Sequence, residues 1–354
     1  MRSLILLVAL MVAFTQTAGA GAKTDVEQHH ELAQAARSAF GRSDFQELNE
    51  RTRSYRIKKP RSASGLWLLT FYYAGLEQAI HVERRQQENP DRMYANLEKQ
   101  TARWARDFPD SPAAHIVHAR VLINHAWAYR GNGLAGTVDP KNWAPFLAYI
   151  AKARRYLEAH KQVAAVDPRW YEVMLIVAKA QNWERPEFER LLAEALDREP
   201  QFYQTYFSAL NYLLPQWHGS VVEIESFAQA AVKRTAATDG RGLYARIYWY
   251  ASQAQFNNRL FEDSLIDWPH MRDGFEDVIK RYPDAWNLNN YAKFACLAED
   301  KRKAHELMDR IGTDIVPEAW TPASLLAYCI QSVTRSDDDH RSAGRDVFEQ
   351  FATR

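Results

Sequence analysis

The sequence predicts an all-α protein built as a tetratricopeptide-like α/α superhelix of about seven degenerate helical hairpins. Apolar residues recur at helical spacing between short breaks, and segments that alternate between apolar and polar residues are almost absent. Prolines that break the chain recur at a hairpin period, with 32 residues between Pro168 and Pro200 and 34 between Pro283 and Pro317. Tetratricopeptide units have this period, and they stack because one hairpin cannot bury its own apolar face.

The first 22 residues are expected to be a cleaved signal peptide. One positive residue, Arg2, precedes an apolar run from Leu4 to Phe14, and the small residues of 18–22 fit the signal-peptidase pattern. The run has 11 residues, whereas a helix that spans a bilayer needs about 20. A buried N-terminal helix is the alternative interpretation. Because no cysteine follows the run, a lipid anchor is not expected, and the sequence predicts a periplasmic or secreted protein that starts near Lys23.

The charge of the mature chain gives no reason to expect nucleic acid or an anionic membrane as a partner. The full chain has 45 Lys and Arg against 44 Asp and Glu, and removal of Arg2 with the signal leaves 44 of each. One local exception is the stretch 51–61, RTRSYRIKKPR, which has six basic residues and no acid. With Pro60 and Gly65 close by, we expect a solvated basic loop that ends an N-terminal helical segment over 23–64.

The repeat domain is expected to cover 65–354, with helices separated by short proline turns. Residues 170–181 form a predicted apolar helix, 186–196 form a predicted amphipathic partner, and a further helix is expected after Pro200. At each turn an amphipathic helix ends in Asp-Pro, Glu-Pro or Tyr-Pro, and an aromatic-rich helix follows. Aromatic residues make up 12% of the chain, and packing between helices explains them more simply than a ligand site does.

Two cysteines, Cys296 and Cys329, remain after signal cleavage and are 33 residues apart, close to one repeat period. In an oxidising compartment such a pair favours a disulfide. Equivalent positions on neighbouring helices, however, lie on axes about 8–10 Å apart, whereas a disulfide needs Cα atoms within roughly 7 Å. Two buried thiols are therefore the favoured expectation, and a disulfide is the alternative.

The stretch GNGLAG at 131–136 matches the dinucleotide-binding spacing G-x-G-x-x-G without its structural context. That fingerprint needs a strand before the glycines and a helix directly after them. Here the preceding residues 115–130 have helical periodicity, the next helix is expected near Trp143, and Thr137 stands where a phosphate loop has lysine. No nucleotide or other cofactor is expected, and the glycines are assigned to a loop insertion near 130–142.

This loop and a second stretch carry a family resemblance. Residues 126–138 match A-W-x-x-R-G-x-G-x-A-x-T-V, and 213–228 resemble L-L-P-R-W-G-G-S followed by an acidic residue and Phe-Ala. Both motifs are similar to those of a bacterial family of secreted, repeat-like proteins that is catalogued as a domain of unknown function, number four thousand and thirty-four. The resemblance covers roughly 45–312 and implies an α-superhelical fold and an exported location, but no activity. Gln216 and His218 depart from the family's Arg and Gly.

Motifs for catalysis or metal binding are missing from the sequence or weak. It has no H-E-x-x-H, no G-x-S-x-G and no cysteine pair at zinc spacing, so neither an enzyme activity nor a metal site is predicted. His115, His118 and His125 lie on one side of a predicted helix, and they would need a ligand from another helix to hold a metal. Ser220 and Glu223 fit a helix-capping box, which explains both residues structurally.

The two family-like loops, near 130–142 and 215–220, are where we expect binding residues, because both interrupt the repeat. Stacked hairpins commonly bind other chains, so the sequence predicts an interaction module for an unknown protein or peptide of the cell envelope. Nucleic acid and stable membrane insertion are not expected. A small-ligand or metal binder, or an enzyme with a site between 126–143 and 215–220, remains the alternative. The candidate contact residues are Trp127, Arg130, Trp143, Trp217 and His218.

Overall fold

The structure is a computed structural model that describes residues 24–81, 90–131 and 133–332, so the expected signal peptide lies outside the described residues. Throughout those ranges the chain forms α-helices joined by turns and short 3-10 or π segments, with no strand. The all-α prediction is therefore confirmed. No helix in the described ranges combines the length and the apolar character that a membrane crossing requires.

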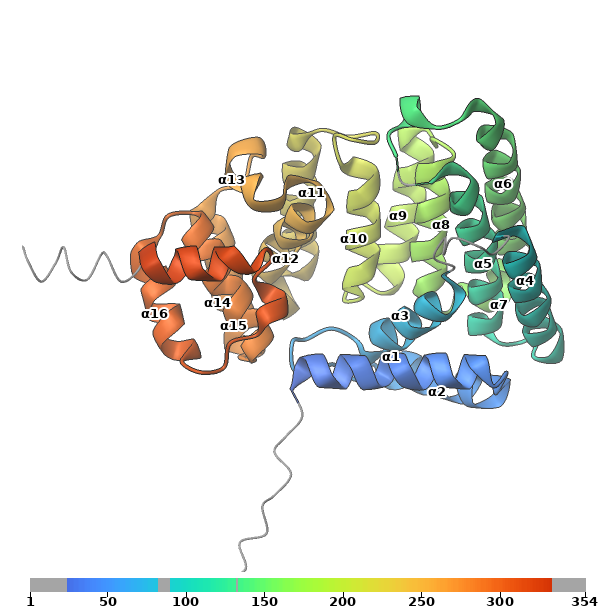
Figure 1. Cartoon of the computed structure of the whole chain (residues 1–354), viewed down its shortest axis with the longest axis horizontal. Coiled ribbons are helices and arrows are strands. Elements are labelled where there is room, and N and C mark those ends of the chain that lie inside the picture. The colour runs from blue at the N-terminus through green and yellow to red at the C-terminus, as the bar shows by residue number, and fades with distance from the viewer. Residues whose placement is uncertain (1–23, 82–89, 132, 333–354) are drawn as a thin grey trace, which may run out of the picture.

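Helices α4 to α16 follow one another in a row and pack mainly on their neighbours (Figure 1). Their bounds are α4 (Pro90–Asp107), α5 (Pro112–Arg130), α6 (Trp143–Ala159), α7 (Lys161–Ala164), α8 (Arg169–Ala180), α9 (Arg185–Arg198), α10 (Tyr203–Leu213), α11 (Val221–Asp239), α12 (Gly242–Ala251), α13 (Leu260–Asp263), α14 (Trp268–Arg281), α15 (Ala285–Leu297) and α16 (Lys301–Ile311). The helices expected over 170–181 and 186–196 are α8 and α9, within two residues at each end.

Two kinds of helix alternate along this row. Helices α5, α8, α10, α12 and α15, here called the inner helices, are buried along most of their length. The helices between them are amphipathic: α16, for example, buries only Ala304, Leu307 and Ile311, which lie three and four residues apart. An inner helix is therefore apolar along most of its sequence because other helices cover it on several sides. The helices between them, here called outer helices, have periodic apolar residues because only one face is covered.

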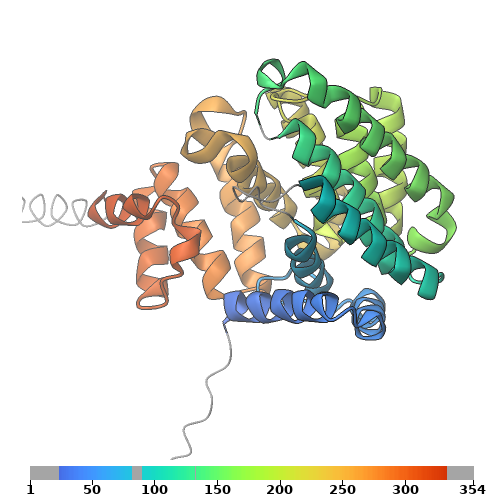
Figure 2. The ribbon, with the colours of Figure 1, turned by 45° about the vertical axis from the view of Figure 1, so that its right-hand side comes forward.

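The first three helices, α1 (Asp25–Gly41), α2 (Phe45–Lys58) and α3 (Leu68–Ile80), do not continue the row. Both views show α1 lying across the ends of other helices (Figures 1 and 2). Helix α3 packs on α1 and α5, and α1 also reaches α15. The N-terminal segment thus joins the two ends of the row, which explains how helices far apart in the sequence are held in one body.

The basic stretch at 51–61 is not the solvated loop that the sequence predicts. Its first eight residues form the end of α2, and the backbone leaves the helix at Lys59, which has a φ of 50°. Lys59 Nζ lies 2.7 Å from a Glu199 carboxylate oxygen, and Arg61 donates to the Gln201 carbonyl oxygen. The reason is that exposed charged residues can lie on a helix as well as in a loop. The acidic partners of Arg56 and Lys59, which are Asp167 and Glu199, are distant in the sequence.

Residues 62–67 lie against the starts of later helices. The Ser64 carbonyl oxygen accepts hydrogen bonds from Arg246 of α12, at 2.6 Å, and from Asn287 of α15, at 3.2 Å. Trp67 packs edge-on against Phe202, just before α10. The N-terminal segment therefore covers the starts of inner helices, and the opposite ends of these helices have to be considered separately.

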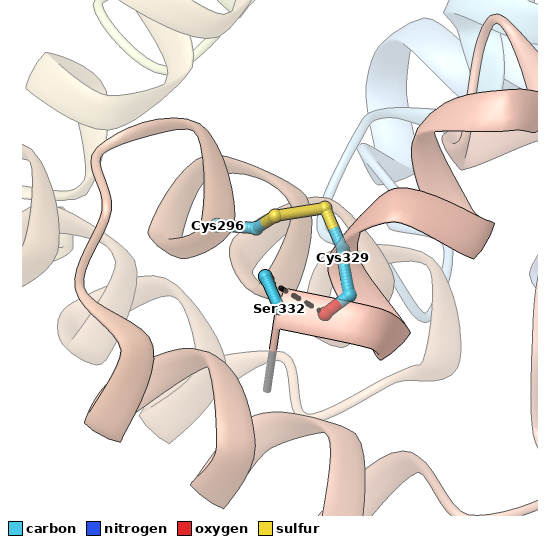
Figure 3. The surroundings of a disulfide bond; sticks show 3 residues. All are labelled: Cys296, Cys329 and Ser332. Atoms are coloured by element: carbon cyan, nitrogen blue, oxygen red, sulfur yellow. Dashed lines mark hydrogen bonds between the residues drawn. A yellow bond between two sulfur atoms is a disulfide. The ribbon is translucent and has the colours of Figure 1, made fainter. Parts of the chain in front are cut away.

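The expectation of two buried thiols is wrong, because Cys296 and Cys329 form a disulfide (Figure 3). Their Cα atoms are 5.8 Å apart. Cys296 belongs to α15, and Cys329 belongs to a helical segment over 323–332 that comes after α16. The argument from side-by-side helix axes fails here, since this last segment runs crosswise to α15 instead of extending the row (Figure 1).

Candidate functional site

The C-terminal ends of three inner helices bring distant aromatic and basic residues together. Arg130 is the last residue of α5, Lys179 is in the last turn of α8, and Trp217 is in the turn after α10. Two further indoles come from the last turns of α5 and the start of α6. We call the set the tryptophan–cation cluster, and its members are Trp127, Arg130, Trp143, Lys179 and Trp217.

Both cations of the cluster lie over indole rings. The guanidinium carbon of Arg130 is 5.0, 5.4 and 5.6 Å from the ring centres of Trp127, Trp143 and Trp217. Lys179 Nζ is 4.3 Å from the Trp217 ring centre and 5.6 Å from that of Trp127. These distances lie within the range of about 6 Å in which the electron-rich ring face attracts a cation. The cluster is therefore one contact network.

The cluster is only partly open to water. Arg130 is 9% exposed, and Lys179 and the three indoles are half-buried. Burial lowers the pKa of Lys179 to about 8, and the nearby Arg120 and Arg130 charges act in the same direction. Burial also lowers the pKa of Arg130. In the described part of the chain no carboxylate lies within 4.0 Å of either cation, so ring faces surround both charges and no acid neutralises them.

Arg130 also holds the glycine loop in place. Its Nη1 donates to the carbonyl oxygens of Gly131 and Gly133, at 3.0 and 3.2 Å. Gly131 has a φ of 71°, which ends α5 in a conformation that glycine adopts without strain. The chain then makes two 3-10 turns before α6, so the glycines lie between two helices, as the sequence predicts. Leu134, at the tip of the loop, is 78% exposed.

The turn after α10 places Trp217 in the cluster and turns His218 away from it. The Trp217 N–H donates to the Leu214 carbonyl oxygen at 2.8 Å. His218 Nε2 donates to the Lys179 carbonyl oxygen at 3.2 Å, and its ring packs 4.6 Å from the Tyr212 ring. Gly219 is required here, since an added Cβ would lie 1.8 Å from the Leu213 carbonyl oxygen. His218 therefore fastens this turn to the end of α8.

Helix α11 begins directly after this turn, with Ser220 as its N-terminal cap. The Glu223 N–H donates to Ser220 Oγ at 3.3 Å, as the capping motif predicts. The Glu223 carboxylate accepts from the Ser220 hydroxyl and pairs with Arg185 of α9. The two residues thus have structural roles that anchor the turn carrying Trp217.

The three histidines of α5 face neighbouring helices and have protein partners. His115 Nε2 donates to the Pro109 carbonyl oxygen at 2.7 Å, and His118 Nδ1 is 2.8 Å from Thr101 Oγ1. His125 lies between Glu98 and a second acid of α4, Asp91. Among the residues that the structure describes, no group of three or more His, Cys, Asp or Glu side chains is placed to hold a metal ion.

A buried ion network lies on the same two helices as the cluster, nearer their N-terminal ends. Glu77 of α3 accepts from Arg120 of α5 at 2.6 and 2.7 Å and from Arg169 of α8 at 2.8 Å. Arg169 also pairs with Glu172. Burial alone raises the pKa of Glu77, but the two arginines lower it to about 2. The network therefore fastens α3 to α5 and α8.

A separate cavity of about 600 Å³ lies between α2 and the turn from α4 to α5. At its edge burial raises the pKa of Asp167 to about 6. The Asp167 carboxylate accepts from Tyr73 Oη at 3.1 Å and from the Arg169 N–H at 3.0 Å, at the start of α8. These two hydrogen bonds and an ion pair with Arg56 account for this carboxyl group, and we do not assign it to a site.

The fold and this cluster define an all-helical protein that displays indoles and cations at one end of its inner helices. No protein-family model, no curated protein and no solved structure matches the chain. The geometry of the chain itself is therefore the ground for a functional assignment. Sequence reasoning selected four of the five cluster residues and missed Lys179. The available signal was that Lys179 is the single basic residue of the apolar stretch 170–181.

Proposed function

We propose that the chain is an exported interaction protein, a tetratricopeptide-like superhelix of about seven hairpins, and that the tryptophan–cation cluster is the centre of its binding surface. One observation carries the proposal. Side chains from four separate segments converge on one half-buried group of indoles and cations: the end of α5, the start of α6, the end of α8 and the turn after α10. Trp and Arg are the residue types that dominate binding energy at protein interfaces.

The helical row supports the superhelical part of the proposal. Inner and outer helices alternate along the chain, and consecutive inner helices α5, α8, α10 and α12 contact each other. In stacked hairpins each unit covers the apolar face of the next, which is the pattern that the burial of these helices follows. The family-like motifs at 126–138 and 213–228 support the same assignment, since both meet at the cluster.

Export to the cell envelope or beyond is supported by two independent features. Residues 1–22 have the composition of a signal peptide. The disulfide between Cys296 and Cys329 is a bond that persists in an oxidising compartment and is rare in the cytosol. Each feature favours the periplasm or the exterior as the place where the partner is met.

The end of the inner helices that carries the cluster is a better docking surface than their starts. Near the starts of α10, α12 and α15, the segment 59–67 of the chain itself occupies the surface. Beside the cluster, large apolar side chains are exposed: Leu134 in the glycine loop, and Leu147 on α6 one turn after Trp143. Exposed apolar side chains around a half-buried aromatic centre are typical of a protein-binding surface.

The experiment is an in vivo crosslinking pull-down of the exported protein with a C-terminal tag. The variant is Trp127→Ala/Trp217→Ala, and the matched control is Trp268→Ala, which removes a half-buried indole that packs on Phe261 and Asp300 instead. Circular dichroism checks that each variant is folded. We expect the wild type and the Trp268 variant to capture the same specific partner, and the double variant to lose it. A partner retained by the folded double variant, or none with the wild type, contradicts the proposal.

A further inference from the structure

We infer that the tryptophan–cation cluster binds a carboxylate, and that its ligand is an acidic side chain in a protein segment with an apolar or aromatic neighbour. The inference rests on the proposed function and adds the chemistry of the partner to it. Three features carry it: the uncompensated charge of the cluster, its hydrogen-bond donors without an acceptor, and its apolar surroundings.

The charge of the cluster is the first feature. Arg130 and Lys179 share two indoles, Trp127 and Trp217, and no acid of the described residues pairs with either. Two like charges in a half-buried place repel each other more strongly than they would in water. A carboxylate placed between them offsets this repulsion and replaces the water that burial removes. The ligand whose charge complements the cluster is therefore one anionic group.

The donors of the cluster are the second feature. Arg130 uses only Nη1 within the described chain, for the carbonyl oxygens of Gly131 and Gly133. A guanidinium has five N–H groups, so its other nitrogens remain as donors, and the ammonium of Lys179 adds three more without a described acceptor. Hydrogen bonds between such donors and a carboxylate are short and about twice as strong as neutral ones.

The surroundings of the cluster are the third feature, and they favour a protein segment over a phosphate polymer. Leu134 of the glycine loop and Leu147 of α6 are exposed, and both belong to segments that carry cluster residues. A polyanion such as a nucleic acid is held by many cations in a stripe, but the mature chain has as many acids as bases. A single carboxylate next to an apolar side chain is therefore the ligand that fits two cations surrounded by indole rings.

The test compares two dipeptide probes that differ only in charge: N-acetyl-Glu-Phe-amide and N-acetyl-Gln-Phe-amide. The mature chain is titrated with each probe at pH 7 and with inorganic phosphate as a third arm, and binding is followed by tryptophan fluorescence. We expect the Glu probe to bind about tenfold more tightly than the Gln probe. Equal binding of the two probes, no binding of the Glu probe, or tighter binding of phosphate overturns the inference.

Variants connect the preference to the cluster. Lys179→Gln is expected to reduce the Glu preference to about threefold or less, because the charge-assisted bond is lost. The matched control is Lys161→Gln: Lys161 also lies over an indole, 5.3 Å from the Trp170 ring centre, but it pairs with Glu194. The control should keep the full preference. An unchanged preference in Lys179→Gln overturns the inference.

A measurement on the wild type replaces the variant if Lys179→Gln does not fold. The Glu preference is expected to fall as pH rises from 7 to 10, because Lys179 loses its proton in this range while the probe stays ionised. A preference that stays constant to pH 10 contradicts the inference. The two proposals fail separately: a partner lost by Trp127→Ala/Trp217→Ala but kept by Lys179→Gln supports the binding surface and removes its carboxylate specificity.

Discussion

Helices α5 and α8 hold basic side chains in two opposite ways. In the ion network, Arg120 from the middle of α5 and Arg169 from the start of α8 each contact the carboxylate of Glu77. At their C-terminal ends, Arg130 and Lys179 have indoles instead of acids around them. The carboxylate of Glu77 neutralises the first pair of charges within the chain, whereas no acid of the described residues neutralises the second pair. The difference separates the structural cations of this protein from those that we propose for binding.

The pKa values express the same difference. The arginines of the ion network lower the pKa of Glu77 to about 2, so its ionised form is stabilised by the fold. In the cluster, burial and neighbouring cations lower the pKa of Lys179 to about 8, so its charged form is destabilised by the fold. Burial lowers the pKa of Lys293 in α15 to about 8 as well, so the convergence of indoles and cations, and not the pKa shift, distinguishes the cluster.

The largest effect is expected from breaking the ion network. Glu77→Gln leaves the half-buried Arg120 without its carboxylate and should lower the free energy of unfolding by about 3 kcal/mol at pH 7. Urea denaturation measures this difference. Glu158→Gln, which removes an exposed partner of Arg154, serves as control and should cost less than about 0.5 kcal/mol. Equal losses in the two variants would remove the distinction between the network and ordinary surface pairs.

A smaller loss is expected from the arginine of the cluster. Arg130→Met removes two hydrogen bonds to loop carbonyl oxygens and three contacts with ring faces, and should destabilise the protein by about 2 kcal/mol. Thermal unfolding checks it. Arg154→Met is the comparison, since Arg154 lies 4.2 Å from the Trp183 ring centre but is more exposed. An effect of Arg130→Met no larger than that of Arg154→Met would show that Arg130 does not order the glycine loop.

The smallest effect is expected to have the opposite sign. Lys179→Met removes a charge that the fold destabilises, so the variant should be more stable than the wild type by about 1 kcal/mol at pH 7. The folded pKa is about 8 against an ordinary 10.5, so the unfolded chain holds this proton more tightly between these values. The free energy of unfolding of the wild type therefore rises relative to that of the variant between pH 8 and 10.5. The difference in stability between the two proteins disappears over this range. A wild type more stable than the variant at pH 7 would show that Lys179 is a structural cation.

The sequence could predict what depends on local periodicity. The helices over 170–181 and 186–196, the loop near 130–142 and the Ser220 cap all follow from residues close together in the chain. Trp127, Arg130, Trp143 and Trp217 could be selected because they lie in or beside motifs at helix ends. That they touch each other depends on how α5, α8 and α10 pack, which no local pattern contains.

What the sequence could not predict depends on contacts between distant segments. Lys59 of the stretch 51–61 has its acidic partner in Glu199, and Cys329 reaches Cys296 only because the last described helix crosses α15. Lys179 was missed for the same reason: within its own helix it is a lone cation, and it becomes part of a site through Trp127 and Trp217. His218 was selected with Trp217, although its ring fastens the turn instead of joining the cluster.

The most direct test of the contrast between structural and binding cations is the titration of Lys179 itself. NMR of the mature chain with labelled lysine, assigned by comparison with Lys179→Arg, gives the pKa of this amine with and without N-acetyl-Glu-Phe-amide. We predict a pKa of about 8 without the probe and a clear rise when the probe binds, because a carboxylate stabilises the ammonium. An amine that titrates near its ordinary 10.5 without the probe, or one whose pKa the probe leaves unchanged, would contradict the account.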